Sequence, residues 1–102
     1  MIVVQGSVRI RAEDSERLRA TAVWLVPAAR NEPGCRMYSL AHDMLDPTLI
    51  HIAQCWESEE AFAAHTRTPH ATRLGEFMRK ITLQELLVKS YVGEGENIIM
   101  GG

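Results

Sequence analysis

Two histidines that lie close together in the chain, His65 and His70, are the side chains best suited to acid-base chemistry. Imidazole changes its charge near neutral pH, so it can take a proton from a substrate. His70 begins an apolar stripe at helical spacing, which predicts that it points toward the interior. Each histidine also has a purely structural interpretation. His70 could lie at the edge of the core, and His65 could donate a hydrogen bond to backbone carbonyls at the end of a helix. We take His70 as the first candidate for a catalytic base and His65 as the second.

Aromatic and amide side chains near these histidines favour a site for a flat ligand. Trp56 ends a predicted strand and offers a wall for an aromatic ring, although a tryptophan in this position is more often part of the core. Gln54 lies on the same apolar face, where its amide needs a partner that a ligand could supply. Phenylalanines on the helix faces of His65 and His70 extend the pocket. The predicted substrate-binding residues are Tyr38, Gln54, Trp56, Phe62 and Phe77.

The other two histidines, His42 and His51, flank a predicted hairpin and could bind a metal ion across it. They share a face in one register of the hairpin, and a slip of one residue places them on opposite faces. The same register decides which face Tyr38 occupies. No third ligand is evident, and Cys35 and Cys55 do not form a Cys-x-x-Cys pair. We therefore predict no metal site.

The predicted elements form one small α+β domain. Strands are expected over residues 2–10, 35–42, 49–56 and 84–92 from their β-branched and alternating residues. The first helix is expected to start after an Asp14 cap and to end at Glu32-Pro33-Gly34. Two shorter helices are expected after Ser58 and after Thr68-Pro69.

This order is β-α-β-β-α-β with a split second helix, the ferredoxin-like arrangement of an antiparallel sheet with its helices on one face. We predict a domain over residues 1–93 and a flexible C-terminal tail over residues 94–102. The strand over residues 49–56 is apolar on both faces, which predicts that a second copy covers the bare face of the sheet in a homodimer.

The composition excludes several classes of protein. The 102 residues are 46% hydrophobic and 24% charged, with a net charge of −2, as in an ordinary globular domain. Basic residues are not in excess, so the composition does not indicate a nucleic-acid partner. The apolar runs are all shorter than the roughly 18 residues of a membrane-spanning helix. Without a secretory leader we expect a cytoplasmic protein whose two cysteines are free thiols. The chain also lacks phosphate-binding and dinucleotide-binding glycine motifs.

Several segments together are similar to the antibiotic biosynthesis monooxygenase family. They are Glu32-Pro33-Gly34-Cys35, Tyr38, Asp46-Pro47, Trp56-Glu57-Ser58, Ala61-Phe62, His65 and Thr68-Pro69-His70. The resemblance covers about residues 2–92. It implies a dimeric ferredoxin-like α/β barrel and an oxidoreductase that oxygenates quinols or polycyclic phenols without a cofactor. The haem-degrading branch is disfavoured, because Gly6 and Gly75 stand where that branch carries an asparagine and its ligating histidine.

We therefore expect a cofactor-independent monooxygenase that acts on a quinol or other hydroxylated (poly)aromatic compound with O₂. A histidine would take the phenolic proton, and the developing oxyanion would accept a hydrogen bond from Gln54. Similar quinol monooxygenases commonly carry Glu at the position of Gln54. The alternatives are a non-catalytic ligand-binding or stress-response domain on the same fold, and an isomerase or decarboxylase that uses the same pocket.

Overall fold

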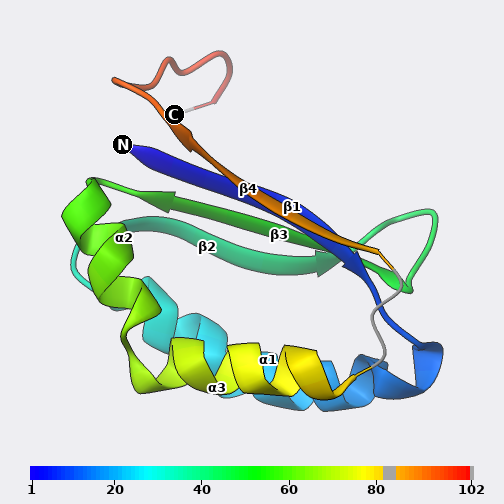
Figure 1. Cartoon of the computed structure of the whole chain (residues 1–102). Helices are drawn as coiled ribbons and strands as arrows, with labels where there is room; N and C mark the ends of the chain where they lie inside the picture. The colour runs from blue at the N-terminus through cyan, green and yellow to red at the C-terminus, as the bar shows by residue number, and fades with distance from the viewer. Residues whose placement is uncertain (82–84, 102) are drawn as a thin grey trace.

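Four antiparallel strands and three helices make up the protein in a computed structural model that describes residues 1–81 and 85–101. The strands are β1 (Ile2–Arg9), β2 (Cys35–His42), β3 (Leu49–Trp56) and β4 (Leu86–Val92), in the spatial order β2-β3-β1-β4. The helices are α1 (Ser15–Arg30), α2 (Glu59–Thr66) and α3 (Pro69–Lys80), with a short 3₁₀ turn, η1 (Ala12–Asp14), before α1. The helices lie on one face of the sheet (Figure 1). This confirms the ferredoxin-like fold with a split second helix. Residue 84 of the predicted last strand and residue 102 of the predicted tail lie outside the described residues.

Each of the two short helices, α2 and α3, begins at a side-chain cap. The Ser58 hydroxyl accepts a hydrogen bond from the Ala61 N–H, and the Thr68 hydroxyl accepts one from the Ala71 N–H. Pro69 occupies the first helical position, where no intrahelical N–H bond is lost. Because the chain turns sharply between the helices, residues at the end of α2 and the start of α3 approach the same region.

The first helix begins where the sequence predicts, but Asp14 does not cap it. Its side chain makes no capping hydrogen bond and is buried. Instead, its carboxylate accepts a hydrogen bond from Arg11 Nε at 2.9 Å and forms an ion pair with Arg17 at 3.5 Å. Two guanidinium groups compensate the buried charge of Asp14 better than one backbone N–H would.

The register of the β2–β3 hairpin decides which side chains face the helices. Tyr38 pairs with Gln54, and His42 pairs with Ile50. Tyr38 and Gln54 therefore share the helix-facing side, whereas His42 and His51 point to opposite faces and cannot bind one metal ion across the hairpin. An irregularity between Cys35 and Met37 shifts the register by one residue at the start of β2.

The core consists of two clusters between the sheet and the helices. One contains six buried residues: Ile2, Val4, Leu25, Ala29, Tyr38 and Trp56. The other contains five buried residues toward the opposite end of the sheet: Val8, Ile10, Leu18, Ile50 and Ile81. Leu74 of α3 packs against both clusters.

The side of the sheet that faces away from the helices remains open in the single chain. Leu87 and Tyr91 of β4 and Met37 of β2 are exposed there, and β4 is exposed along its whole length. Beyond β4, residues 93–101 form no helix or strand, and Glu96 pairs with Arg36 at 3.1 Å. Within residues 1–81 and 85–101, none of the helices has the length and apolar character needed to cross a bilayer.

Candidate functional site

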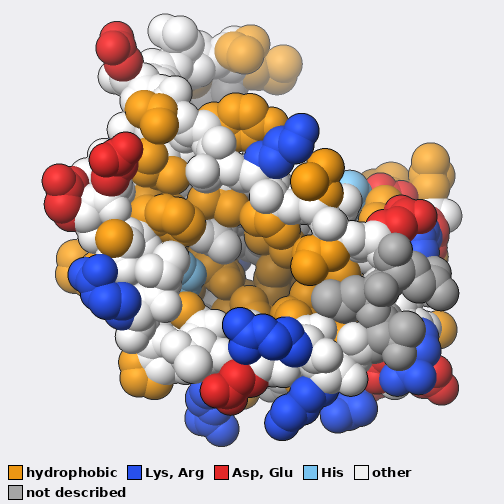
Figure 2. All heavy atoms as spheres, in the orientation of Figure 1, with side chains coloured by type: hydrophobic (Ala, Val, Ile, Leu, Met, Phe, Trp, Pro, Cys, Tyr) orange, Lys and Arg blue, Asp and Glu red, His pale blue; other side chains and the backbone are white. Residues whose placement is uncertain are grey.

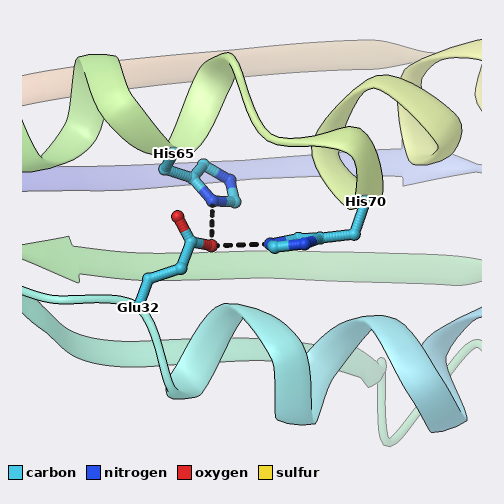
Figure 3. A group of neighbouring side chains, drawn as sticks. All are labelled: Glu32, His65 and His70. Atoms are coloured by element: carbon cyan, nitrogen blue, oxygen red, sulfur yellow. Dashed lines mark hydrogen bonds and ion pairs between the residues drawn. The ribbon is translucent and has the colours of Figure 1, made fainter.

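Glu32, His65 and His70 meet in one hydrogen-bonded group (Figure 3). Glu32 lies in the turn after α1, His65 at the end of α2 and His70 at the start of α3. The Oε2 atom of Glu32 lies 2.7 Å from His65 Nδ1 and 2.7 Å from His70 Nε2. Three segments that are distant in the sequence thus converge on one carboxylate oxygen.

The turn that carries Glu32 depends on the glycine two residues later. Gly34 has φ of +82°, a conformation that L side chains rarely adopt. An added Cβ at Gly34 would also lie 2.6 Å from the Cβ of Ala61 in α2. Because Gly34 has no side chain, the turn lies directly against α2, and this contact brings Glu32 to His65.

The hydrogen bonds determine which nitrogen of each imidazole carries hydrogen. An ionised carboxylate can only accept, so Nδ1 of His65 and Nε2 of His70 donate. In a neutral ring this leaves a lone pair on His65 Nε2 and on His70 Nδ1. The exposed fractions of the side chains rise from 6% for His65 through 11% for Glu32 to 17% for His70. His65 is therefore the inner member of the group, and His70 is nearest to solvent.

A cavity of about 240 Å³ lies between the sheet and the helices, beside His65. Its wall contains the polar side chains of Tyr38, Gln54 and His65. Apolar residues from the sheet and the helices supply most of the remainder, among them Val8, Leu18, Ile50, Ile52, Leu74 and Met78. No Lys, Arg, Asp or Glu of the described residues lines it. Figure 2 shows the hollow, with hydrophobic side chains around it, between the sheet and α3.

Gln54 presents its amide nitrogen at this cavity. Its Oε1 accepts a hydrogen bond from Trp56 Nε1–H at 3.0 Å. Because an indole can only donate, the bond identifies the oxygen end of the amide. The NH₂ group of Gln54 has no hydrogen-bond partner among the residues that the structure describes. Gln54 therefore has two donor hydrogens available to a ligand.

Tyr38 is buried beside His65, with 5.5 Å between the ring centroids. Burial raises the pKa of its phenol to about 12, and the negative charge of Glu32 adds to the effect. Its hydroxyl has no hydrogen-bond partner in the described part of the chain. At neutral pH Tyr38 is therefore an uncharged hydroxyl group at the cavity wall.

The structure brings together most of the residues selected from the sequence, but only Tyr38, Gln54 and His65 line the cavity. Trp56 is fully buried, with its ring 4.5 Å from that of His65. His70 contacts Glu32 and does not line the cavity. The two phenylalanines pack against the core clusters, Phe62 against the first and Phe77 against the second.

Glu32 is the member of the candidate site that the sequence did not reveal. From the sequence it was only the last residue before the Pro-Gly turn that ends the first helix. A charged residue in such a turn is ordinary, and nothing local indicates that its carboxylate is largely buried. The available signal was its place in the Glu-Pro-Gly-Cys segment that carries the family resemblance.

Comparison with known proteins identifies the family. The sequence model for antibiotic biosynthesis monooxygenases matches residues 1–76. The chain belongs to this family. An uncharacterized protein of Synechocystis sp. is 28% identical over 69 residues, which is 68% of this chain. The chain spans about half the length of this curated relative, because the match covers 47% of it.

Solved structures of similar proteins support the assignment. A candidate antibiotic biosynthesis monooxygenase from Deinococcus radiodurans superposes with a TM-score of 0.88 at 26% identity, over 99% of this chain and 100% of the other. A second candidate, from Nitrosomonas europaea, gives a TM-score of 0.82 at 17% identity over 91% and 98% of the two chains, which supports the fold alone. The family and these structures indicate a monooxygenase-like or small-molecule-binding fold.

Proposed function

We propose that the protein is a cofactor-independent monooxygenase that uses O₂ to oxygenate a neutral quinol or phenol of one or two rings. The observation that carries the proposal is the cavity beside the Glu32–His65 pair. It combines an apolar wall with three polar side chains, from Tyr38, Gln54 and His65. Such a cavity suits a flat apolar body with a hydroxyl group.

The size and charge of the cavity limit the substrate. An engineered protein cavity of about 150 Å³ accommodates benzene, so about 240 Å³ leaves room for a second ring or for substituents. A carboxylate or phosphate on the ligand would lose its hydration without a cationic partner, because no Lys or Arg of the described residues lines the wall. We therefore propose an uncharged substrate.

His65 is the proposed base, in preference to His70. His65 lines the cavity, and its Nδ1–H bond to Glu32 leaves the Nε2 lone pair as the acceptor. A phenol with a pKa of about 10 stays protonated at neutral pH, and only its anion readily gives an electron to O₂. The carboxylate of Glu32 stabilises the imidazolium that forms, as a buried carboxylate does for other catalytic histidines.

The proposed reaction balances without an added cofactor. The quinol anion gives one electron to O₂, and the resulting radical and superoxide combine in a carbon–oxygen bond. The proton held by His65 passes to the outer oxygen of this peroxide. The C–H bond at the oxygenated carbon then breaks, and its electron pair forms the new C=O bond as the oxygen–oxygen bond cleaves. The proton released from this carbon joins the departing hydroxide as water. A quinol and O₂ thereby become a hydroxyquinone and water. The two N–H groups of Gln54 would stabilise the anionic oxygen during these steps.

Oxygen consumption by the purified protein tests this proposal. A panel of quinols and phenols with one to four rings is supplied in an oxygen-electrode assay, with metal and flavin content measured on the same sample. We expect uptake with one-ring or two-ring quinols and none with four-ring phenols. Binding without uptake across the panel would favour the ligand-binding alternative. Conversion without O₂ would favour an isomerase or decarboxylase, and uptake that follows bound flavin or metal would contradict cofactor-free chemistry.

We also propose that a second copy of the chain covers the open face of the sheet. Leu87 and Tyr91 are 60% and 50% exposed there, and Met37 is 44% exposed. Exposed apolar side chains grouped on one face are typical of an interface. Sedimentation is expected to give a homodimer at micromolar concentration, and Leu87→Asp is expected to weaken it. A monodisperse monomer of the unaltered chain would contradict the proposal.

A further inference from the structure

We infer that Glu32, His65 and His70 form a binding site for a divalent transition-metal ion such as Zn²⁺, and that the bound ion switches the proposed oxygenase off. The switch rests on the proposed function, whereas the metal site does not. One ligand atom from each of the three side chains, two nitrogens and one oxygen, lies within 4.8 Å of the others. In the two ion pairs that hold this group together, both partners of the Glu32 carboxylate are histidines, and neither is a Lys or Arg.

The three ligand atoms would have to move to bind an ion. Zinc bonds to histidine nitrogen and carboxylate oxygen are about 2.0–2.2 Å long, so neighbouring ligand atoms in a tetrahedral site lie about 3.3 Å apart. The two pairs that include Glu32 Oε2 are separated by 2.7 Å. An ion placed among the three atoms would push each of these pairs apart by about 0.6 Å. The two imidazole nitrogens lie within 4.8 Å of each other and would have to settle about 3.3 Å apart, so both rings would rotate toward a common position.

The donor set selects the kind of metal. Imidazole nitrogen with one carboxylate suits Zn²⁺, Co²⁺, Ni²⁺ and Cu²⁺, whereas Mg²⁺ and Ca²⁺ prefer a shell of oxygens. Three protein ligands leave a fourth position for water. His70 is 17% exposed, so the group is close enough to solvent for an ion to enter.

Metal binding would change the hydrogen-bonding role of His65 in the cavity. The lone pair of Nδ1 must bind the ion, so the hydrogen that Nδ1 donates to Glu32 moves to Nε2 in a neutral ring. Figure 3 shows Nδ1 directed at Glu32 and the second ring nitrogen on the side away from it. The nitrogen proposed to accept the phenolic proton would then be a donor, so the base would be lost without any change in fold.

Metal binding by the chain of 102 residues, after treatment with a chelator, tests the site independently of activity. Zn²⁺ is titrated in a calorimeter, and Co²⁺ is added separately for its visible absorption spectrum. We expect one ion per chain at micromolar affinity and a four-coordinate Co²⁺ spectrum. His70→Ala and Glu32→Gln are expected to weaken binding at least tenfold, while His51→Ala serves as the matched control and retains wild-type affinity. Absence of Zn²⁺ binding at millimolar concentration, or equal losses in His51→Ala and His70→Ala, would overturn the site.

The activity assay then tests the switch. If the metal-free protein consumes O₂ with a quinol, one equivalent of Zn²⁺ is expected to lower the rate at least tenfold, and excess chelator is expected to restore it. An unchanged rate in protein that calorimetry shows to be loaded with Zn²⁺ would overturn the switch and leave the site standing. A metal-free protein that binds Zn²⁺ but never consumes O₂ would contradict the proposed function and the switch together, again without affecting the site.

Discussion

The protein contains two pairs of histidines, and their surroundings differ in every respect that matters for chemistry. His65 and His70 share one carboxylate, that of Glu32, beside the cavity between the sheet and the helices. His42 and His51 lie at the hairpin on opposite faces of the sheet, and His51 bonds to Asp43 at 2.7 Å in an exposed pair. The same pairing of imidazole and carboxylate thus occurs once in the interior and once at the surface.

This difference shows that burial and shared geometry, rather than the presence of a histidine and a carboxylate, separate a candidate site from a surface ion pair. The side chains of His51 and Asp43 are 49% and 27% exposed, so water competes with the bond between them. Glu32 is 11% exposed and His65 is 6% exposed, so their bond forms where water competes little.

Removal of the inner histidine is expected to have the largest effect. His65→Ala should lower the rate of quinol oxygenation by about 10²–10⁴, the usual cost of losing a catalytic base. His51→Ala should leave the rate unchanged within about twofold, because surface substitutions away from a site have small effects. Oxygen uptake under saturating quinol measures both. Equal rates for His65→Ala and the wild type would remove His65 from the mechanism.

Removal of the shared carboxylate should affect stability more than removal of the exposed pair. Glu32→Ala leaves one buried and one half-buried imidazole N–H group without their acceptor, and we expect the free energy of unfolding to fall by about 1–3 kcal/mol. His51→Ala breaks only the exposed pair and should cost less than about 1 kcal/mol. Urea denaturation measures the difference, provided that the free energy of unfolding falls with urea concentration at the same slope in both variants. Similar losses in the two variants would contradict the distinction.

The charge of Glu32 should also be detectable at Tyr38. The phenol of Tyr38 has its pKa raised to about 12, first by burial and then by Glu32. Since the unfolded chain releases this proton near pH 10 and the folded chain near pH 12, the contribution of Tyr38 is complete below pH 10 and is lost as the pH rises to about 12. Ultraviolet absorption followed against pH should show one phenol that ionises at unusually high pH. Tyr38→Phe should remove this transition, and Glu32→Gln should shift it to lower pH. No shift in Glu32→Gln would contradict the electrostatic contribution.

The smallest effect is expected at the hairpin. The hydrogen bond from His51 and the backbone N–H of Leu45 lower the pKa of the Asp43 carboxyl. His51→Ala should raise that pKa toward its ordinary value, but only in part, because the N–H groups of Leu45 and Asp46 still donate to Asp43. Carboxyl chemical shifts followed by NMR against pH would measure the change. A pKa that stays the same in the variant would show that the His51 contact contributes nothing in solution.

The fold could be predicted from the sequence because its signals are local. Ser58 and Thr68 cap α2 and α3 as their residue types predict, and Pro69 occupies the first position of α3. Strand alternation also placed Gln54 and Trp56 on the helix-facing side, which the burial of both residues confirms. Asp14 was mispredicted as a cap, since its two arginine partners are long side chains whose directions the sequence does not specify.

The candidate site was only partly predictable because its contacts join distant segments. Glu32 is separated from His65 by 33 residues and from His70 by 38, so only the tertiary structure brings them together. The stripe position of His70 predicted an inward direction but not the target of the ring. The face of Tyr38 depended on the hairpin register, which a one-residue slip would have reversed.

The cavity beside His65 also affects how the protein responds to heat. Its largely apolar wall opens to solvent, as the hollow in Figure 2 shows. An aromatic compound that enters it would bind the folded chain and not the unfolded one, and would stabilise the fold by about 2.7 kcal/mol at a concentration 100 times its Kd. The melting temperature thus reports whether the space is filled, even for a compound that undergoes no reaction.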